Sequence, residues 1–552
     1  MKKVLILTVL LASVPVLGFS QTAYTVNNAA AWTQAVNGIR NGGNNKEYAI
    51  TVTGAVSVPP APNNVNTFGS VTGVTVTIAG NGTLSPSGNG CLLQIGARQT
   101  VVARDLTLRG RSANNASVVD IASGGTFRME GNATVSGNTE ANRNGIGGGV
   151  YVDGNFIMQD RASVKDNTAR NKNGGGVYVG EGGTLTMRGS ASVSGNTAGN
   201  NGGGVYINGG TFTMQDSASV SGNTASDFGG GGGVLVDGGT FIMRDNASVS
   251  GNTASDFGGG GGVSVWGGTF AMQGNAQVSD NTAGKSSGGG VYVSSGTFTM
   301  RDTTSVSGNT SYYSVYNEGT FTMQGSASVS GNIGGGVTNS GTFTMKGGTI
   351  SGNTGAGVYV IRPGDGGGAG TFIMEGGIIS GNTGGGVVVG AISGLHGNLR
   401  GTFIKTGGTI YGDDADQNFK NTVITRLGSA VYDEGNGRWR NTTAGPTMNT
   451  DSLGFWLNDG DVVIFPSGFA ETWERSNSNN TLTVTQNTMN SSSSDYVWVL
   501  QSISDNTYTL KRADAANTKT LTIRLDRSNL VISGDSGSGE DNWNGTWREL
   551  EW

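Results

Sequence analysis

The stretch 221-SGNTASDFGGGGGVLVDGGTFIMRDNASV-249 is followed directly by 250-SGNTASDFGGGGGVSVWGGTFAMQGNAQV-278. The two segments are nearly identical in sequence and form a tandem repeat of 29 residues. Pieces like GTFTM recur eleven times, starting at residues 125, 155, 183, 210, 239, 268, 296, 319, 341, 370 and 401. The usual spacing is 27 to 29 residues, with two shorter units between 300 and 345. No unit holds a helix-length amphipathic run, which excludes helical repeats and indicates a β-solenoid.

Each unit has three short pieces, typified by GGGVYV, GTFTM and ASVSGNT. Every piece alternates with period two: in 210–214, Phe212 and Met214 share one face and Thr211 and Thr213 share the other. Such alternation is typical of strands. Three strands per unit fit one rung of a parallel β-helix, in which equivalent side chains of successive rungs stack about 4.8 Å apart. We therefore expect an all-β fold over residues 45–445, with about eleven regular rungs after irregular opening rungs.

An asparagine recurs in the SGNT or DNT turn of the third piece. Stacked asparagines form hydrogen-bonded ladders along a coil. The sequence therefore predicts a turn ladder rather than a ligand site from Asn138, Asn167, Asn196, Asn223, Asn252, Asn281, Asn309, Asn332, Asn353 and Asn382.

The two ends of the chain differ from the repeat. Residues 1–20 combine Lys2 and Lys3, a short apolar run and small residues, which is typical of a secretory signal peptide; a membrane anchor is the alternative. Residues 21–44 contain the amphipathic run NNAAAWTQAVNGIRNG (27–42), which we expect to form a capping helix with Trp32 as a plug. A cap of this kind covers the terminal strands of a β-helix, whose backbone N–H and C=O groups would otherwise be unpaired.

Composition changes near residue 446. Six of the nine tryptophans lie beyond it, among strand-like runs separated by polar turns. Residues 446–552 are thus expected to form a small antiparallel β barrel or sandwich. The tryptophans either fill its core or line a pocket.

Composition also narrows the chemistry. A single histidine and a single cysteine argue against most metal sites, and a lone cysteine cannot form an internal disulfide. The net charge of −5 argues against nucleic-acid binding. We expect no cofactor and no metal. Asp227 and Asp256 recur one rung apart; they are either solvated or a calcium site, and solvation is the simpler interpretation.

The glycine-rich, asparagine-turn rungs over roughly residues 45–430 resemble those of bacterial right-handed parallel β-helix surface proteins. They are similar to the polymorphic outer-membrane-protein repeats of chlamydiae and to long repeat proteins of treponemes. The resemblance implies a right-handed coil and a role as an adhesin or autotransporter passenger. The tail is too short for an autotransporter membrane barrel, and its NWNGTW (542–547) resembles the entry motif of lipocalin-like barrels.

These features indicate a secreted, non-catalytic cell-surface protein of the outer membrane or the exterior, with the periplasm as the alternative location. It would act as an adhesin or rigid spacer that binds a glycan or a partner protein, in an oligomeric state that the sequence leaves open. The candidate binding surface is a column of tyrosines at one rung position, which would either contact ligand or pack between rungs. The column contains Tyr151, Tyr178, Tyr206, Tyr292 and Tyr359.

The alternative function is a polysaccharide lyase or hydrolase, because pectate lyases share the β-helix fold. Such enzymes need paired carboxylates or a basic residue in one groove. Near-identical rungs argue against a groove, so a localised site is expected only where the repeat breaks. The candidates in the irregular loops are Arg362, Asp365, His396 and Arg400.

Overall fold

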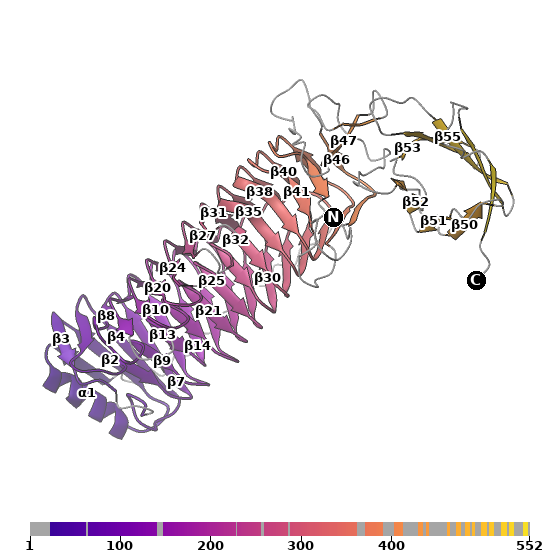
Figure 1. Cartoon of the computed structure of the whole chain (residues 1–552). Helices are drawn as coiled ribbons and strands as arrows, with labels where there is room; N and C mark the ends of the chain where they lie inside the picture. Colours follow the sequence, from indigo (N-terminus) through magenta and orange to yellow (C-terminus); the bar gives the residue numbers. More distant parts are fainter. Residues whose placement is uncertain are drawn as a thin grey trace, which may run out of the picture.

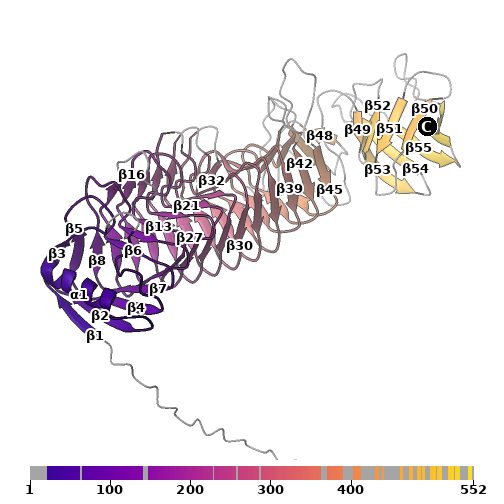
Figure 2. The same ribbon diagram turned by 90° about the horizontal axis from the view of Figure 1, so that it is seen from below.

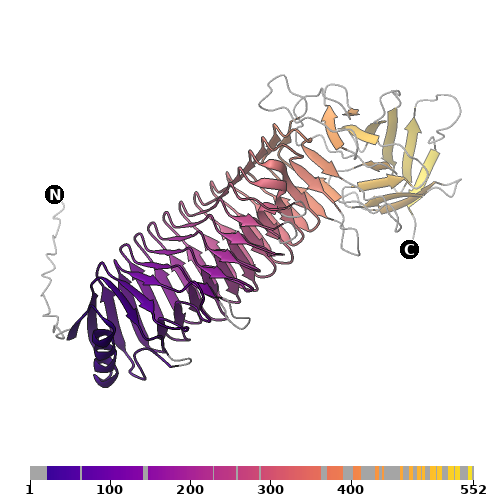
Figure 3. The same ribbon diagram turned by 60° about the vertical axis from the view of Figure 1, so that its left-hand side comes forward.

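The computed structural model describes residues 22–61, 65–140, 147–227, 229–255, 259–284, 288–361, 370–389 and 402–411, and the backbone of eleven short strands between Ser429 and Glu549. The predicted repeat architecture is confirmed: the described chain winds into a parallel β-solenoid of about 13 turns with one short helix. The coil forms a long rod with helix α1 (Ala29–Asn41) at one end (Figure 1). Two further views show the strands of successive turns stacked along the rod (Figures 2 and 3).

Three long sheets run along the coil. The first sheet carries the Phe-x-Met pieces: β1 (Thr22–Val26), β2 (Glu47–Val52), β4 (Val74–Ala79), β7 (Gln99–Arg104), β10 (Thr126–Glu130), β14 (Asn155–Met158), β18 (Thr184–Met187), β22 (Thr211–Met214), β26 (Thr240–Met243), β30 (Thr269–Met272), β33 (Thr297–Met300), β36 (Thr320–Met323), β39 (Thr342–Met345), β42 (Thr371–Met374) and β45 (Thr402–Lys405).

The second sheet carries the Ser-Val-Ser pieces: β3 (Ala55–Val58), β5 (Thr83–Pro86), β8 (Thr107–Arg109), β11 (Thr134–Ser136), β15 (Ser163–Lys165), β19 (Ser192–Ser194), β23 (Ser219–Ser221), β27 (Ser248–Ser250), β31 (Gln277–Ser279), β34 (Ser305–Ser307), β37 (Ser328–Ser330), β40 (Thr349–Ser351), β43 (Ile378–Ser380) and β46 (Thr409–Ile410).

The third sheet carries the Val-Tyr-Val pieces. Its parallel strands are β6 (Leu93–Ile95), β9 (Val119–Ile121), β13 (Val150–Val152), β17 (Val177–Val179), β21 (Val205–Asn208), β25 (Val234–Asp237), β29 (Val263–Val265), β32 (Gly288–Val293), β35 (Thr310–Asn317), β38 (Ile333–Asn339), β41 (Val358–Val360) and β44 (Val387–Val389). A narrow fourth sheet joins two-residue strands of five turns, of which the first is Thr-Glu and the other four are Thr-Ala: β12 (Thr139–Glu140), β16 (Thr168–Ala169), β20 (Thr197–Ala198), β24 (Thr224–Ala225) and β28 (Thr253–Ala254).

The interior consists of ladders of identical side chains. From Phe212 to Phe403, the phenylalanine rings of successive turns stack with centroids 4.6–5.0 Å apart, and every ring is buried. Leu185 replaces phenylalanine in one turn, and Lys405 takes the methionine position in the last described one. The ladders follow from the sequence repeat, because a stacking coil must place the same side-chain volume at the same position in every turn.

The predicted asparagine ladder is confirmed. All ten side chains are fully buried. From Asn167 to Asn353, each side-chain amide donates to the Oδ1 atom of the asparagine in the next turn, and the backbone N–H of Asn138 donates to Asn167 Oδ1. In the middle of the row, Asn252 Oδ1 accepts hydrogen bonds from Asn223 N (3.0 Å) and Nδ2 (2.9 Å). Asn252 Nδ2 donates to Asn281 Oδ1 (2.9 Å) and to the carbonyl oxygen of Val220 (3.1 Å). Buried amides are tolerated here because each one is satisfied within the ladder.

The predicted capping helix is also confirmed. Asn28 caps its first turn by accepting a hydrogen bond from the backbone N–H of Ala31 (2.9 Å), as short polar side chains do. Trp32, Ala35 and Ile39 point into the coil and are buried against the first turns. The helix therefore closes the N-terminal end of the hydrophobic core.

The coil changes width near Thr310. In the lower half, a long glycine-rich corner separates the fourth sheet from the third: Val234 follows Thr224 by ten positions. In the upper half the corner shortens, and Val337 follows Ile333 by only four positions. There the two sheets merge, so β35 and β38 each run continuously where lower turns have two strands. We call this change of width the step.

Beyond the coil, nine strands from β49 (Asp461–Val463) to β57 (Gly545–Glu549) pair antiparallel in one sheet. Whether residues 446–552 form a barrel or a sandwich stays a prediction, as does the signal peptide, whose residues 1–20 lie outside the described part. Among the described residues, no helix is long and apolar enough to cross a membrane.

Replacing Asn252 with alanine should lower the stability of the coil by about 3–5 kcal/mol, because it leaves several buried polar groups without partners. Thermal unfolding and amide exchange around Asn252 measure the loss. The matched control is Asn246→Ala, because Asn246 is exposed and makes one surface hydrogen bond of 3.2 Å. Equal melting temperatures for the two variants would contradict a stabilising role for the ladder.

Candidate functional site: the outward face of the third sheet

The five predicted tyrosines do occupy one column on the outward face of the third sheet. Backbone pairing aligns Tyr151 with Tyr178 and Tyr178 with Tyr206, and their rings lie 5.3 and 5.1 Å apart. Tyr292 and Tyr359 occupy the same position farther up the coil. Leu235 and Ser264, both fully buried, separate the lower three tyrosines from the upper ones.

The tyrosines of the lower turns make hydrogen bonds within the protein. Tyr206 is only 6% exposed and donates a hydrogen bond from Oη to Asp237 Oδ2 (2.7 Å) in the next turn. Tyr178 Oη accepts one from Asn208 Nδ2 (3.0 Å). Burial raises the pKa of Tyr206, and the bond to Asp237 raises it further, so the phenol stays protonated. For these tyrosines the geometry favours packing between turns, and a binding role for the column stays a prediction.

Glycine is required beside these rings. Gly202 has φ of +65°, and a Cβ there would lie 2.8 Å from the Cβ of Tyr206. Only glycine adopts this backbone conformation readily and leaves room for the neighbouring ring. The glycine-rich corner of the lower turns therefore folds back against the tyrosine column.

A second group of aromatic side chains lies at the step. Tyr316 continues the column directly above Tyr292, with ring centroids 5.5 Å apart. Tyr313 lies 5.5 Å from Tyr316, and Tyr312 lies 6.3 Å from Tyr313. Tyr312 is 59% exposed, unlike any tyrosine of the lower turns. We call Tyr312, Tyr313, Tyr316 and Tyr292 the step tyrosines.

Two carboxylates lie at the N-terminal end of the same face. Asp120 of β9 pairs with Tyr151, and Asp153 follows two residues after Tyr151 on the outward side. Partial burial raises the pKa of Asp120 to about 6, and the charge of Asp153 adds to the rise. Asp153 also hydrogen-bonds to Tyr151 and helps to raise the pKa of that phenol. One carboxyl group with a raised pKa beside another is an arrangement that general acid catalysis can use.

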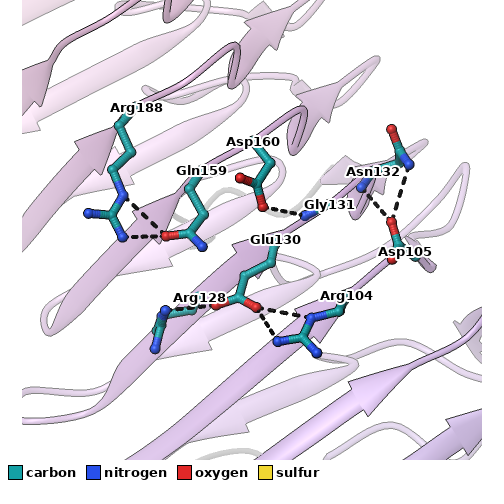
Figure 4. Close-up of polar contacts among 9 residues, drawn as sticks. All are labelled: Arg104, Asp105, Arg128, Glu130, Gly131, Asn132, Gln159, Asp160 and Arg188. Carbon is teal, nitrogen blue, oxygen red and sulfur yellow. Dashed lines mark hydrogen bonds and ion pairs between the residues drawn. The ribbon is translucent and has the colours of Figure 1, made fainter.

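The most strongly paired charges belong to the first sheet. The Glu130 carboxylate, which is buried, lies between Arg104 (Nη2 to Oε2, 2.6 Å) and Arg128 (Nη2 to Oε1, 2.7 Å), as Figure 4 shows. In the same view, the N–H of Gly131 donates to Asp160 Oδ2 (2.9 Å) of the next turn. Arg104 and Arg128 pair with the same carboxylate, and Arg104 reaches it from the turn before, so we interpret this cluster as a connection between turns.

The loop candidates Arg362, Asp365, His396 and Arg400 lie outside the described residues, and so does Asp256 of the predicted calcium alternative. The structure therefore leaves these predictions untested. Within the described segments, no three side chains of the metal-binding types form a cluster.

The sequence interpretation missed four residues of this face: Tyr312, Tyr313, Tyr316 and Asp120. The signal for Tyr316 was present, because aligning 315-VYN with the Val-Tyr-Val pieces places it in the column. Tyr312 and Tyr313 were hidden because the short turn lacks the glycine corner that sets the alignment. Asp120 lies in an irregular opening turn whose register only the backbone pairing reveals.

No family model, curated protein or solved structure matches the chain.

Replacing Asp120 with asparagine should make stability less dependent on pH. A carboxyl group whose pKa is raised on folding binds its proton more tightly in the folded state, so stability falls as pH rises from about 4 to about 6. The variant removes this loss and should be more stable than the wild type by about 2 kcal/mol above pH 6 and equal to it near pH 4. Denaturant unfolding between pH 4 and 8 measures this. A difference that does not change with pH would show that Asp120 titrates normally.

Proposed function

We propose that the protein is a secreted bacterial cell-surface rod, non-catalytic, that acts as an adhesin or rigid spacer and binds a glycan or a partner protein. The observation that carries the proposal is the unbroken register of the first sheet, in which Phe-x-Met pieces pair one to one from β10 to β45 apart from single replacements. A coil stacked in this way is stiff along its axis and holds its two ends at a fixed separation.

The repeat itself favours a spacer. Near-identical turns contact only their neighbours, so turns are gained or lost without altering a distant site. The resemblance to polymorphic outer-membrane-protein repeats supports a right-handed coil on the cell surface, reached through the signal peptide in residues 1–20. The antiparallel tail at 446–552 would then be the module that the rod presents, and a periplasmic location is the alternative.

Protease treatment of intact cells tests the location. The glycine-rich stretch 362-RPGDGGGAG-370 should be cut if the rod faces the medium. We expect loss of the full-length protein while a periplasmic marker stays intact. Complete protection until the outer membrane is opened would overturn the surface role.

A second function is favoured by one observation. Asp120 and Asp153 lie in adjacent turns of one sheet face, and the pKa of Asp120 is raised to about 6. A glycoside hydrolase needs one protonated and one ionised carboxyl group, so a polysaccharide-active enzyme is the alternative function. Here Asp120 would be the general acid.

A screen of neutral and acidic polysaccharides for reducing-end release tests the enzyme. If it is correct, Asp120→Asn and Asp153→Asn each lower turnover at least a hundredfold, the usual size of a general acid–base contribution. Wild-type protein that releases no reducing ends contradicts catalysis and leaves the rod as the proposed function.

A further inference from the structure

We infer that the step is a binding site for a neutral oligosaccharide of pyranose sugars, which stacks on Tyr312 and Tyr313. This inference rests on the proposed adhesin function and gives that function a place and a ligand class. It differs from the predicted tyrosine column, because its two central residues lie outside that column and belong to a turn with a different backbone.

The step creates the site by removing the glycine corner. Backbone pairing aligns Tyr313 with Gly288 in the turn below and with Gly335 in the turn above. Neither neighbour has a side chain, so the Tyr313 ring lies over bare backbone; a Cβ at Gly335 would lie 3.8 Å from Tyr313 Cδ1. In the lower turns the chain beside the tyrosine column is a glycine-rich loop. At the step that loop is replaced by two tyrosines.

The exposed surface of the step is apolar. Tyr312 is 59% exposed and Ile333, in the next turn, is 58% exposed; these are the highest values among the exposed large hydrophobic side chains of the described residues. Such surface is costly in water unless something covers it. Because aromatic faces carry partial negative charge, they attract the C–H groups of a sugar ring while the sugar hydroxyls remain at the edge.

Polar groups lie at the rim of the aromatic surface. Tyr292 Oη donates a hydrogen bond to Glu318 Oε2 (2.6 Å), and Tyr316 hydrogen-bonds to the same carboxylate. A carboxylate that keeps free lone pairs can accept further hydrogen bonds from sugar hydroxyls. A few polar groups at the edge of an apolar surface are what fixes the orientation of a small ligand.

The charge near the step favours a neutral sugar over an acidic one. Residues 288–361 contain only four charged side chains: Arg301, Asp302, Glu318 and Lys346. Arg301 and Lys346 follow strands of the first sheet, at a different corner of the coil, and Lys346 approaches Glu375 there. Glu318 is thus the one charge on the step face of this segment. Its negative charge would repel a sialylated or uronic-acid glycan.

Size favours a glycan over a protein. Three turns, β32, β35 and β38, carry the step tyrosines and Ile333, and three strands at sheet spacing span about 10 Å. A stable protein interface needs about 800 Å² on each partner, several times such a patch. A short run of sugar rings fits it.

The test uses the secreted chain on an array of neutral oligosaccharides with sialylated and uronic-acid counterparts, followed by calorimetry on the best ligand. We expect binding to neutral glycans, weakened about tenfold by Tyr312→Ser and again by Tyr313→Ser. The control is Ile378→Ser, which removes another exposed hydrophobic side chain, 40% exposed, from the second sheet. Its affinity should equal that of the wild type. Circular dichroism melting confirms that all three variants fold.

Four results would overturn the inference: no binding to any neutral glycan, binding to acidic glycans only, binding to a protein ligand only, or equal loss in Tyr312→Ser and Ile378→Ser. These outcomes are separate from the surface test. A rod that is cut on intact cells but ignores neutral glycans keeps its proposed function and loses this site. A rod that is protected on intact cells loses the function whatever the array shows.

Discussion

The structure depends on one constraint: every turn must put the same group at the same height as the turn below. Parallel strands about 4.8 Å apart stack each inward side chain on its equivalent in the next turn, so side chains of similar size and shape pack best inside the coil. The buried asparagines make the constraint sharpest, because each amide is satisfied only if its neighbour is also an asparagine in the same register. The phenylalanine rings impose the same requirement through volume and stacking.

This constraint explains why the repeat is so poor in reactive groups. Inward positions hold stacked apolar and asparagine side chains, and the outward positions are mostly threonine and serine, so few positions of either set can build a site. One corner that varies in length lies between the asparagine turn and the third sheet, where the separation ranges from four positions (Ile333 to Val337) to eleven (Thr139 to Val150). Both candidate ligand surfaces, the Asp120–Asp153 pair and the step tyrosines, adjoin irregular turns. The candidate sites therefore lie beside turns that depart from the regular repeat.

Much of the fold could be predicted from the sequence, because period-two alternation and a 29-residue repeat report directly on strand and stacking geometry. Phe212, Met214 and Asn223 could each be assigned an inward position from spacing alone, and the capping helix from its apolar stripe. The exposure of the tyrosines could not be predicted in the same way. Alternation shows that Tyr206 points outward. It does not show that a glycine loop folds back beside the ring, or that Asp237 accepts a hydrogen bond from the Tyr206 hydroxyl. The step was visible as two short units, yet the placement of Tyr313 between two glycines depends on a register shift that spacing does not reveal.

The asparagine ladder also gives the coil a direction. In each pair from Asn167–Asn196 to Asn353–Asn382, the side-chain amide of the earlier turn donates and the side-chain oxygen of the later turn accepts, so these side-chain dipoles all point the same way along the axis. A turn continues the row only if its asparagine oxygen faces the N–H groups of the turn before it, whereas a turn inserted backwards would set donor against donor. The rod is therefore polar in the sense that a filament is polar: its two ends are chemically different, and each finished turn is a template for the turn that follows it in the chain.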